Sequence, residues 1–322
     1  MWRVKSLDAI LATAEKKSLH RSLGPIQLTL LGIGGIIGTG IFVLTAEAAQ
    51  KAGPGMLLSF VIAGFVCAVA ALCYSELAAM APVSGSAYTY SYAVLGEFVA
   101  WLVGWALILE YAVAASAAAV GWSGYVVGLL DHSLGIVIPF ELANGPHAGG
   151  IVNLPAIIIA AAVTGLLVIG TTESATVNAV LVAIKVAALT AFIILSVPVI
   201  DDTHFRPFAP LGGSGVIAAA ASIFFAYVGF DAVSTAAEET RNPQRNVPIG
   251  LIGSLAICTI FYMLVAAGAI GAYGAQPVMG VNGEHLATGS TQLAARCAAL
   301  SQAADTPLVC SREALAHVMR QI

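Results

Sequence analysis

Apolar stretches long enough to cross a bilayer recur along most of the chain. Each has about 20 residues or more, the length that an α-helix needs to span the hydrocarbon core. Turns rich in glycine, proline or polar residues separate them, such as 52–55 and 201–204. We predict seven transmembrane helices, approximately at residues 25–49, 56–80, 95–130, 151–170, 177–199, 213–237 and 247–273.

The first span contains a run of glycines that a continuous helix does not favour. Gly32, Gly34, Gly35, Gly38 and Gly40 fill five of nine consecutive positions. Each costs up to about 1 kcal/mol relative to alanine in a helix. If the helix is interrupted, its freed backbone groups must line a cavity or bind a ligand, because lipid cannot satisfy them. Small residues at this spacing also form close helix–helix contacts, so both interpretations stay open for this stretch alone.

The sixth span carries a second candidate interruption. Gly229 and Asp231 lie in its middle, among apolar and aromatic residues. Spans one and six are five helices apart, so they cross the membrane in opposite directions. Interrupted helices at corresponding positions of two inverted halves indicate the binding site of a secondary transporter. The second interruption therefore favours a binding site over simple packing.

Composition supports an all-α integral membrane protein. The 322 residues are 59% hydrophobic and 9% charged, with a mean hydropathy of +0.92, whereas soluble domains carry about 25% charged residues. The five cysteines form no CxxC pair and no zinc spacing, so we expect no metal site and no cofactor.

Other classes of membrane protein lack support in the sequence. The six histidines lie outside the apolar spans, and no HExxH or GxSxG motif is present, so we do not expect an enzyme. The chain has no P-loop for an ATP-driven pump, and no filter or charged ring for a channel.

Basic residues near the span ends predict the orientation. Five of them precede the first span, and Arg241 and Arg245 lie between spans six and seven. The opposite side holds only Lys51 and Arg206 before the last segment. The positive-inside rule then places the N-terminus in the cytoplasm of a multi-pass protein of the cell membrane.

We expect four parts: a cytoplasmic segment 1–24, a first set of five helices 25–199, two further helices 213–273, and an extracytoplasmic loop 274–322. The loop contains Cys297 and Cys310, and a disulfide and two free thiols both remain open there. It ends in an amphipathic pattern that leads toward another span, so we interpret the sequence as C-terminally truncated.

Several motifs together resemble the amino acid–polyamine–organocation (APC) superfamily, and within it the cationic amino acid transporter branch. They are GGIIGTGIF at 34–42, YSEL at 74–77, PVSGSAY at 82–88, GWALILEY at 104–111, FAYVGFD at 225–231 and EETRNP at 238–243. The resemblance covers essentially all of residues 20–273. It implies a LeuT-like fold of two inverted five-helix repeats, of which this chain holds the first and only two helices of the second.

The resemblance also implies a function. We expect secondary active transport of amino acids by proton-coupled symport and alternating access. The expected partners are an amino acid, protons and the lipid bilayer, with no nucleic acid. The oligomeric state is not indicated. An amino acid exchanger and a non-transporting truncated fragment are the alternatives.

Backbone groups at the two interruptions are the expected contacts of the amino acid head group. N–H groups at the start of a half-helix suit the carboxylate, and freed carbonyl oxygens suit the ammonium. The candidates for the carboxylate are Ile37, Gly38, Thr39 and Gly40, and those for the ammonium are Ile33, Gly34, Phe225, Ala226 and Val228. The Thr39 hydroxyl either assists or bonds back to its own helix. By resemblance Phe225 is an aromatic gate over the substrate, although adjacent aromatics such as Phe224 and Phe225 otherwise suggest packing.

Two ionisable residues inside the spans are candidates for proton coupling. Lys185 is the only Lys or Arg within a span, at a depth where a charge is costly and usually marks function. In proton-coupled relatives an ammonium here stands where sodium-coupled relatives bind a cation. The alternative is a static strut bonded to the carbonyls of helix 1. Glu110, in span three, is either a proton site, a contact for a basic substrate or a neutral core acid, and Asp231 is expected to be structural.

Overall fold

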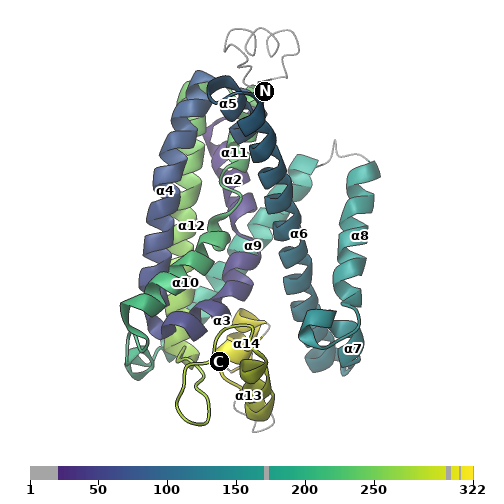
Figure 1. Ribbon diagram of the computed structural model, residues 1–322, viewed down its shortest axis with the longest axis vertical. Coiled ribbons are helices and arrows are strands. Elements are labelled where there is room, and N and C mark those ends of the chain that lie inside the picture. Colours follow the sequence, from purple (N-terminus) through teal and green to yellow (C-terminus); the bar gives the residue numbers. More distant parts are fainter. Residues whose placement is uncertain (1–20, 170–173, 302–305, 312, 322) are drawn as a thin grey trace.

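The computed structural model describes residues 21–169, 174–301, 306–311 and 313–321 (Figure 1). Most of the predicted cytoplasmic segment 1–24 therefore lies outside the described residues. Within the described part, the regular elements are helices, and β-structure is limited to isolated bridges. This confirms the prediction of an all-α protein.

The helices follow the predicted spans closely. They are α2 (Pro25–Ile36), α3 (Thr39–Ala52), α4 (Met56–Met80), α5 (Ser86–Val94), α6 (Glu97–Leu134), α7 (Phe140–Ala143), α8 (Leu154–Ile169), α9 (Ser174–Ser196), α10 (Gly212–Tyr227), α11 (Ala232–Thr235), α12 (Pro243–Tyr273), α13 (Thr291–Ser301) and α14 (Ala314–Gln321). The first span comprises α2 and α3, the sixth comprises α10 and α11, and α4, α6, α8, α9 and α12 form the others.

Five stretches of the described residues are long and apolar enough to cross a membrane. They are Gly40–Met80, Glu97–Leu134, Ala179–Val199, Gly212–Glu239 and Pro243–Tyr273, and Pro25–Ile36 and Leu154–Leu166 are shorter apolar helices. The first stretch contains both α3 and α4, so each of the seven predicted spans has a counterpart. The protein is thus a multi-pass membrane protein.

The core lies where the interrupted helices meet α4 and α12. Helix α12 packs along α4 and α2, and α10 packs against α3 and α4. Helix α9 contacts α2 and α12 from another side. Helix α6 contacts α3 and α5, and α8 packs on α6 at the far side from this group (Figure 1). Exposed apolar side chains on α6, such as Trp101 and Trp105, suit contact with lipid.

The two interrupted segments run in opposite directions (Figure 1). Helices α2 and α11 lie toward the end that carries Arg21, and α3 and α10 lie toward the opposite end. Contacts join α3 to α10 and α2 to α11. This is the antiparallel crossing that the inverted-repeat prediction requires. The Arg241 amide also donates to Leu23 O at 2.9 Å, which places two predicted cytoplasmic segments together.

The segment after α12 lies at the end of the molecule opposite Arg21 (Figure 1). Helix α14 confirms the helix predicted near the C-terminal end of the chain. Cys297 and Cys310 form a disulfide, with their Cα atoms 5.3 Å apart. The structure therefore decides between the two states that the sequence left open.

Candidate functional site

The first interruption separates α2 from α3 at Ile37 and Gly38. Ile37 is extended, with φ −71° and ψ 91°, and Gly38 has φ −139° and ψ −143°. The Ile37 amide still donates to Ile33 O at 2.9 Å. Beyond it, the amides of Gly38, Gly40 and Ile41 make no hydrogen bond to another described backbone group. The predicted break in helix 1 is confirmed, and unpaired N–H groups open α3.

The second interruption occupies Val228 to Asp231, between α10 and α11. Its backbone turns are bonded locally, from Val228 N to Phe225 O at 3.4 Å and from Ala232 N to Gly229 O at 3.2 Å. Gly229 has φ +110°, a conformation that side-chain-bearing residues rarely adopt. Gly229 and Asp231, which the sequence singled out, lie in this break, whereas Phe225 lies within α10, which continues to Tyr227.

The two interruptions lie against each other. A Cβ atom on Gly40 would collide with the Cα and Cβ atoms of Ala226, and one on Gly229 would lie 2.7 Å from Gly35 O. The close-packing interpretation of the glycines is therefore also correct. The same residues that break the helix let the two half-helices approach at backbone distance.

Lys185 reaches the first interruption from α9. Its Nζ atom donates to Ile37 O at 2.9 Å and to Gly34 O at 3.3 Å. Lys185 lies eleven residues after Ser174, roughly 17 Å along the helix axis. No ion pair of Lys185 with a carboxylate occurs among the described residues. Its charge therefore faces backbone oxygens, which is the contact that the strut interpretation expects.

Tyr262, in α12, serves both interruptions and was missed in the sequence. Its hydroxyl lies 2.8 Å from Ile36 O and 3.0 Å from Ala226 O. The side chain has no exposed surface. A hydroxyl near the middle of an apolar span needs a polar partner, and this requirement could have identified Tyr262 from the sequence. The sequence does not tell which carbonyl that partner is.

These side chains replace donors that the break removes. In a continuous helix, Gly34 O, Ile36 O and Ile37 O would accept from the amides of residues 38, 40 and 41. In the structure Lys185 bonds two of these oxygens and Tyr262 bonds the third. Side chains thereby donate to these carbonyl oxygens, and the amides of residues 38, 40 and 41 have no described backbone acceptor. The first interruption is consequently a concentration of backbone donors.

The remaining predicted site residues take varied positions. Ala226 is buried, and Val228 and Gly34 are partly buried. Phe225, the predicted gate, is 52% exposed in the last turn of α10. The side chain of Thr39 lies outside the described residues, so neither predicted role of its hydroxyl can be placed.

Glu110 and Lys185, the two predicted proton-coupling residues, are not paired with each other in the described part of the chain. Glu110 is partly buried in α6. Its neighbour Tyr111 donates to Asp231 Oδ2 at 2.8 Å. Helix α6 therefore contacts the second interruption at this level, and Asp231 has the structural contact expected of it.

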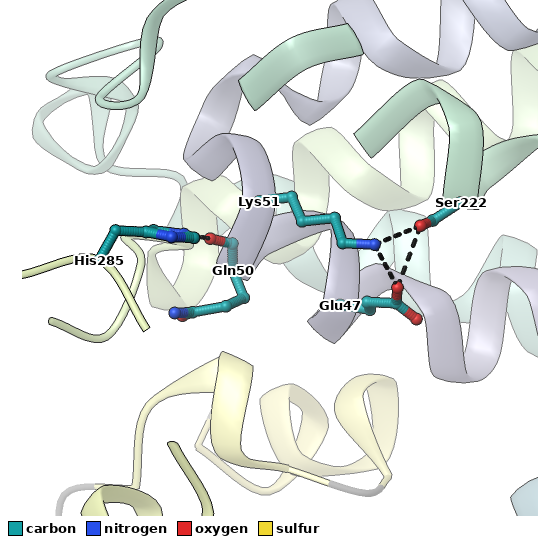
Figure 2. A network of polar contacts seen from close by, with 5 residues as sticks. All are labelled: Glu47, Gln50, Lys51, Ser222 and His285. Atoms are coloured by element: carbon teal, nitrogen blue, oxygen red, sulfur yellow. Dashed lines mark hydrogen bonds and ion pairs between the residues drawn. The ribbon is translucent and has the colours of Figure 1, made fainter. Parts of the chain in front are cut away.

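Polar contacts also join α3 and α10 away from the interruptions, toward the end of the molecule opposite the start of α2 (Figure 2). Lys51 on α3 lies 2.6 Å from Glu47 Oε1 and also donates to Ser222 on α10. Ser222 in turn donates to Glu47 at 3.0 Å. The half-helices α3 and α10 are thus connected at this end as well as at their interruptions.

Gln50 connects α3 to the segment after α12. Its side-chain amide donates to Val278 O at 2.9 Å and to Leu286 O at 2.8 Å, and its Oε1 accepts from Val278 N at 2.7 Å. His285 also lies 3.2 Å from Gln50 O (Figure 2). This end of the protein further holds a cavity of about 550 Å³, partly lined by Arg296 and Tyr273, which contains no residue of either interruption.

The architecture defines a class: a helical membrane protein with two antiparallel interrupted helices in contact at its centre. A family model for amino acid permeases matches residues 23–290. The chain belongs to this family. The match and the relatives confirm the APC superfamily and the cationic amino acid transporter branch, and with them a LeuT-like helical fold.

Several relatives of known name are similar over most of the chain. The branched-chain amino acid permease BcaP of Bacillus subtilis is 50% identical over 83% of this chain and 58% of its own length. The methylthioribose transporter of the same organism is 47% identical over 83% of this chain and 58% of its own length. The chloroplastic cationic amino acid transporter 9 of Arabidopsis thaliana is 42% identical over 76% and 44%. These names describe permeases and transporters, and no enzyme.

The chain thus spans about 58% of the length of the bacterial relatives it matches. The names also differ in cargo, from branched-chain and cationic amino acids to methylthioribose. Membership in the family therefore does not by itself identify a substrate.

Proposed function

We propose that the protein containing this chain carries amino acids across the cell membrane by proton-coupled symport. The observation that carries the proposal is the first interruption, where Lys185 and Tyr262 bond carbonyl oxygens while the amides of Gly38, Gly40 and Ile41 have no backbone partner among the described residues. Such groups at a helix N-terminus bind anions, and the helix dipole adds to the attraction.

The head group of an amino acid fits the two interruptions together. The carboxylate binds the N–H groups of Gly38, Thr39 and Gly40 at the start of α3, whereas the Ile37 amide, also predicted for this role, already donates to Ile33 O. The ammonium binds carbonyl oxygens at the end of α10, where the helix dipole is negative. Ala226 O and Val228 O lie at that end, beside the first interruption. Gly34 O and Ile33 O complete this set from the first interruption.

Lys185 couples the site to protons in this proposal. Two hydrogen bonds from an ammonium to Gly34 O and Ile37 O are stronger than the same bonds from a neutral amine. Loss of the proton weakens them and loosens the carbonyls that border the carboxylate site. An ionisable group at this depth in a membrane helix is by default a functional candidate. Glu110 is the proposed second proton site.

Phe225 is the proposed gate, since its ring is exposed one turn before the second interruption.

The segment 25–199 forms the first repeat and 213–273 begins the second. The end with Arg21 and Arg241 faces the cytoplasm, because basic residues concentrate there. The segment 274–322, with its disulfide, lies on the outer side, where disulfides persist.

The test uses the complete gene product in proteoliposomes. Uptake of labelled leucine and labelled arginine is measured with an inward proton gradient, with an inward sodium gradient and with neither. We expect accumulation of at least one amino acid with the proton gradient alone. Equal accumulation driven by sodium contradicts the coupling. Counterflow exchange without net accumulation assigns an exchanger, and no transport of any amino acid contradicts the function.

A further inference from the structure

Tyr262 occupies a fixed position between the two interrupted helices. Its side chain is fully buried in α12. The ring packs against Phe60 on α4 and Tyr227 on α10, with centroids 5.8 Å and 5.4 Å away. These contacts come from two other helices, one continuous and one ending at the second interruption, and they help to fix where the hydroxyl lies.

The hydroxyl meets one carbonyl from each interruption. Ile36 is the last residue of α2, and its oxygen lies 2.8 Å from the hydroxyl; Ala226 is in the last turn of α10, and its oxygen lies 3.0 Å away. In continuous helices these oxygens would accept from the amides of Gly40 and Phe230. Instead, the Phe230 amide donates to Tyr227 O at 3.4 Å. Tyr262 thus offers its one proton to two carbonyl oxygens that the interruptions leave without their helical donors.

A phenol carries one proton, so Tyr262 donates to one oxygen at a time while holding both within hydrogen-bond distance. Contacts of Gly40 with Ala226 and of Gly35 with Gly229 fix how closely the backbones approach. They are steric and resist compression only. Among the described residues, Tyr262 is the side chain whose hydrogen bonds attract carbonyls of both interruptions toward one point.

We propose that Tyr262 is a positioning residue that sets the relative placement of the two halves of the head-group site. The inference rests on the proposed function, because the site is that of an amino acid. The carboxylate donors belong to one interrupted helix and the ammonium acceptors to the other. A substrate that bridges them binds tightly only when their separation matches its own head group. Tyr262 maintains that separation before the substrate arrives.

Tyr227 provides a matched control. It is also fully buried, and its ring is the one that packs on Tyr262. Its hydroxyl donates to Phe60 O at 3.1 Å, a carbonyl of the continuous helix α4. Tyr262→Phe and Tyr227→Phe therefore each delete one buried hydroxyl and keep the ring. Only the first deletion removes a link between the interruptions.

The first measurement compares KM for amino acid uptake in the complete gene product with the thermal stability of each variant. For Tyr262→Phe we expect KM to rise about tenfold, the loss of roughly one good hydrogen bond, with Tm close to that of Tyr227→Phe. Tyr227→Phe should leave KM within about twofold of the unchanged protein. An unchanged KM in Tyr262→Phe, or equal increases in both variants, would overturn the proposal.

The second measurement does not need a substrate. Amide hydrogen exchange is followed in the peptides around 33–42 and 224–232. We expect Tyr262→Phe to speed exchange in both peptides and Tyr227→Phe to leave the first peptide unchanged. Faster exchange in one peptide alone contradicts the link. If the unchanged protein transports no amino acid, the proposed function fails, whereas this exchange result still decides whether Tyr262 joins the interruptions.

Discussion

The two interruptions are held in different ways. The first is two residues long and depends on side chains from distant helices, Lys185 of α9 and Tyr262 of α12. The second is four residues long and bonds its own backbone through successive tight turns. It is further tied to α6 by Tyr111 and Asp231.

The first interruption thus depends on side chains of other helices, whereas the second has its own backbone turns in addition to the contacts from Tyr111 and Tyr262. Local turns keep their geometry as neighbouring helices shift, because their bonds lie within the same segment. The carbonyls of the first interruption lose their donors as soon as α9 or α12 moves or Lys185 changes charge. We infer that the first interruption responds to the protonation state, and that the second serves as its more rigid counterpart.

The largest loss of stability is expected from a substitution at the contact between the two interruptions. Gly40→Ala places a methyl group against the backbone of Ala226, which cannot rotate away as a side chain can. Overpacking typically costs about 1–3 kcal/mol, and we expect the upper end of this range or more. The measurement is the thermal unfolding of the detergent-solubilised protein, together with uptake.

Gly165→Ala is the matched control for this change. Gly165 lies in α8 with no atom within 4 Å of the added methyl group, so its Tm should not fall. If Gly40→Ala is as stable and active as Gly165→Ala, the interruptions are not in contact as described.

Loss of Lys185 is expected to have the next largest effect. Lys185→Ala deletes two bonds to the first interruption, each worth about 1.5–3 kcal/mol when one partner is charged. Proton-driven accumulation should fall to the level of protein-free liposomes while the protein remains folded. Lys51→Ala is the control, because Lys51 bonds Glu47 and Ser222 and neither interruption. Normal proton-driven uptake in Lys185→Ala would leave Lys185 a structural strut.

The smallest effect is expected at the second interruption. Tyr111→Phe deletes the bond to Asp231 but leaves the local turns in place. We expect a loss of about 1.5 kcal/mol of stability, the lower end for one hydrogen bond to a charged group, and a KM for uptake within about twofold of normal. A loss of transport as large as that of Lys185→Ala would show that the second interruption is not self-supporting.

The sequence predicted the architecture well because the bilayer constrains it strongly. Apolar length located the seven spans, and glycine content located the first interruption. Depth within a span singled out Lys185. These signals are local, so they can be recognised without knowing which helices are neighbours.

Contacts between distant segments could not be predicted in the same way. Nothing in the spacing shows that Tyr262 reaches Ile36 and Ala226, because this depends on how α12 packs between α2 and α10. The sequence suggested the second interruption around Gly229 and Asp231, but only the fold shows that α10 continues past Phe225 to Tyr227 and that Gly229 has a positive φ. Cysteine spacing likewise left the disulfide open, since pairing requires a Cα separation that only the fold provides.

The most direct test of the account is whether the protein recognises both charged ends of an amino acid. The complete gene product is reconstituted, and uptake of its best labelled amino acid is competed with the unlabelled amino acid, its carboxamide and its N-acetyl derivative. The carboxamide lacks the anion expected at Gly38 to Gly40, and the N-acetyl form lacks the cation expected at Ala226 and Val228. We predict that the free amino acid competes and that both derivatives are at least about 100-fold weaker, the loss of roughly 2.7 kcal/mol or more. Equal competition by either derivative would contradict the head-group site proposed at the two interruptions.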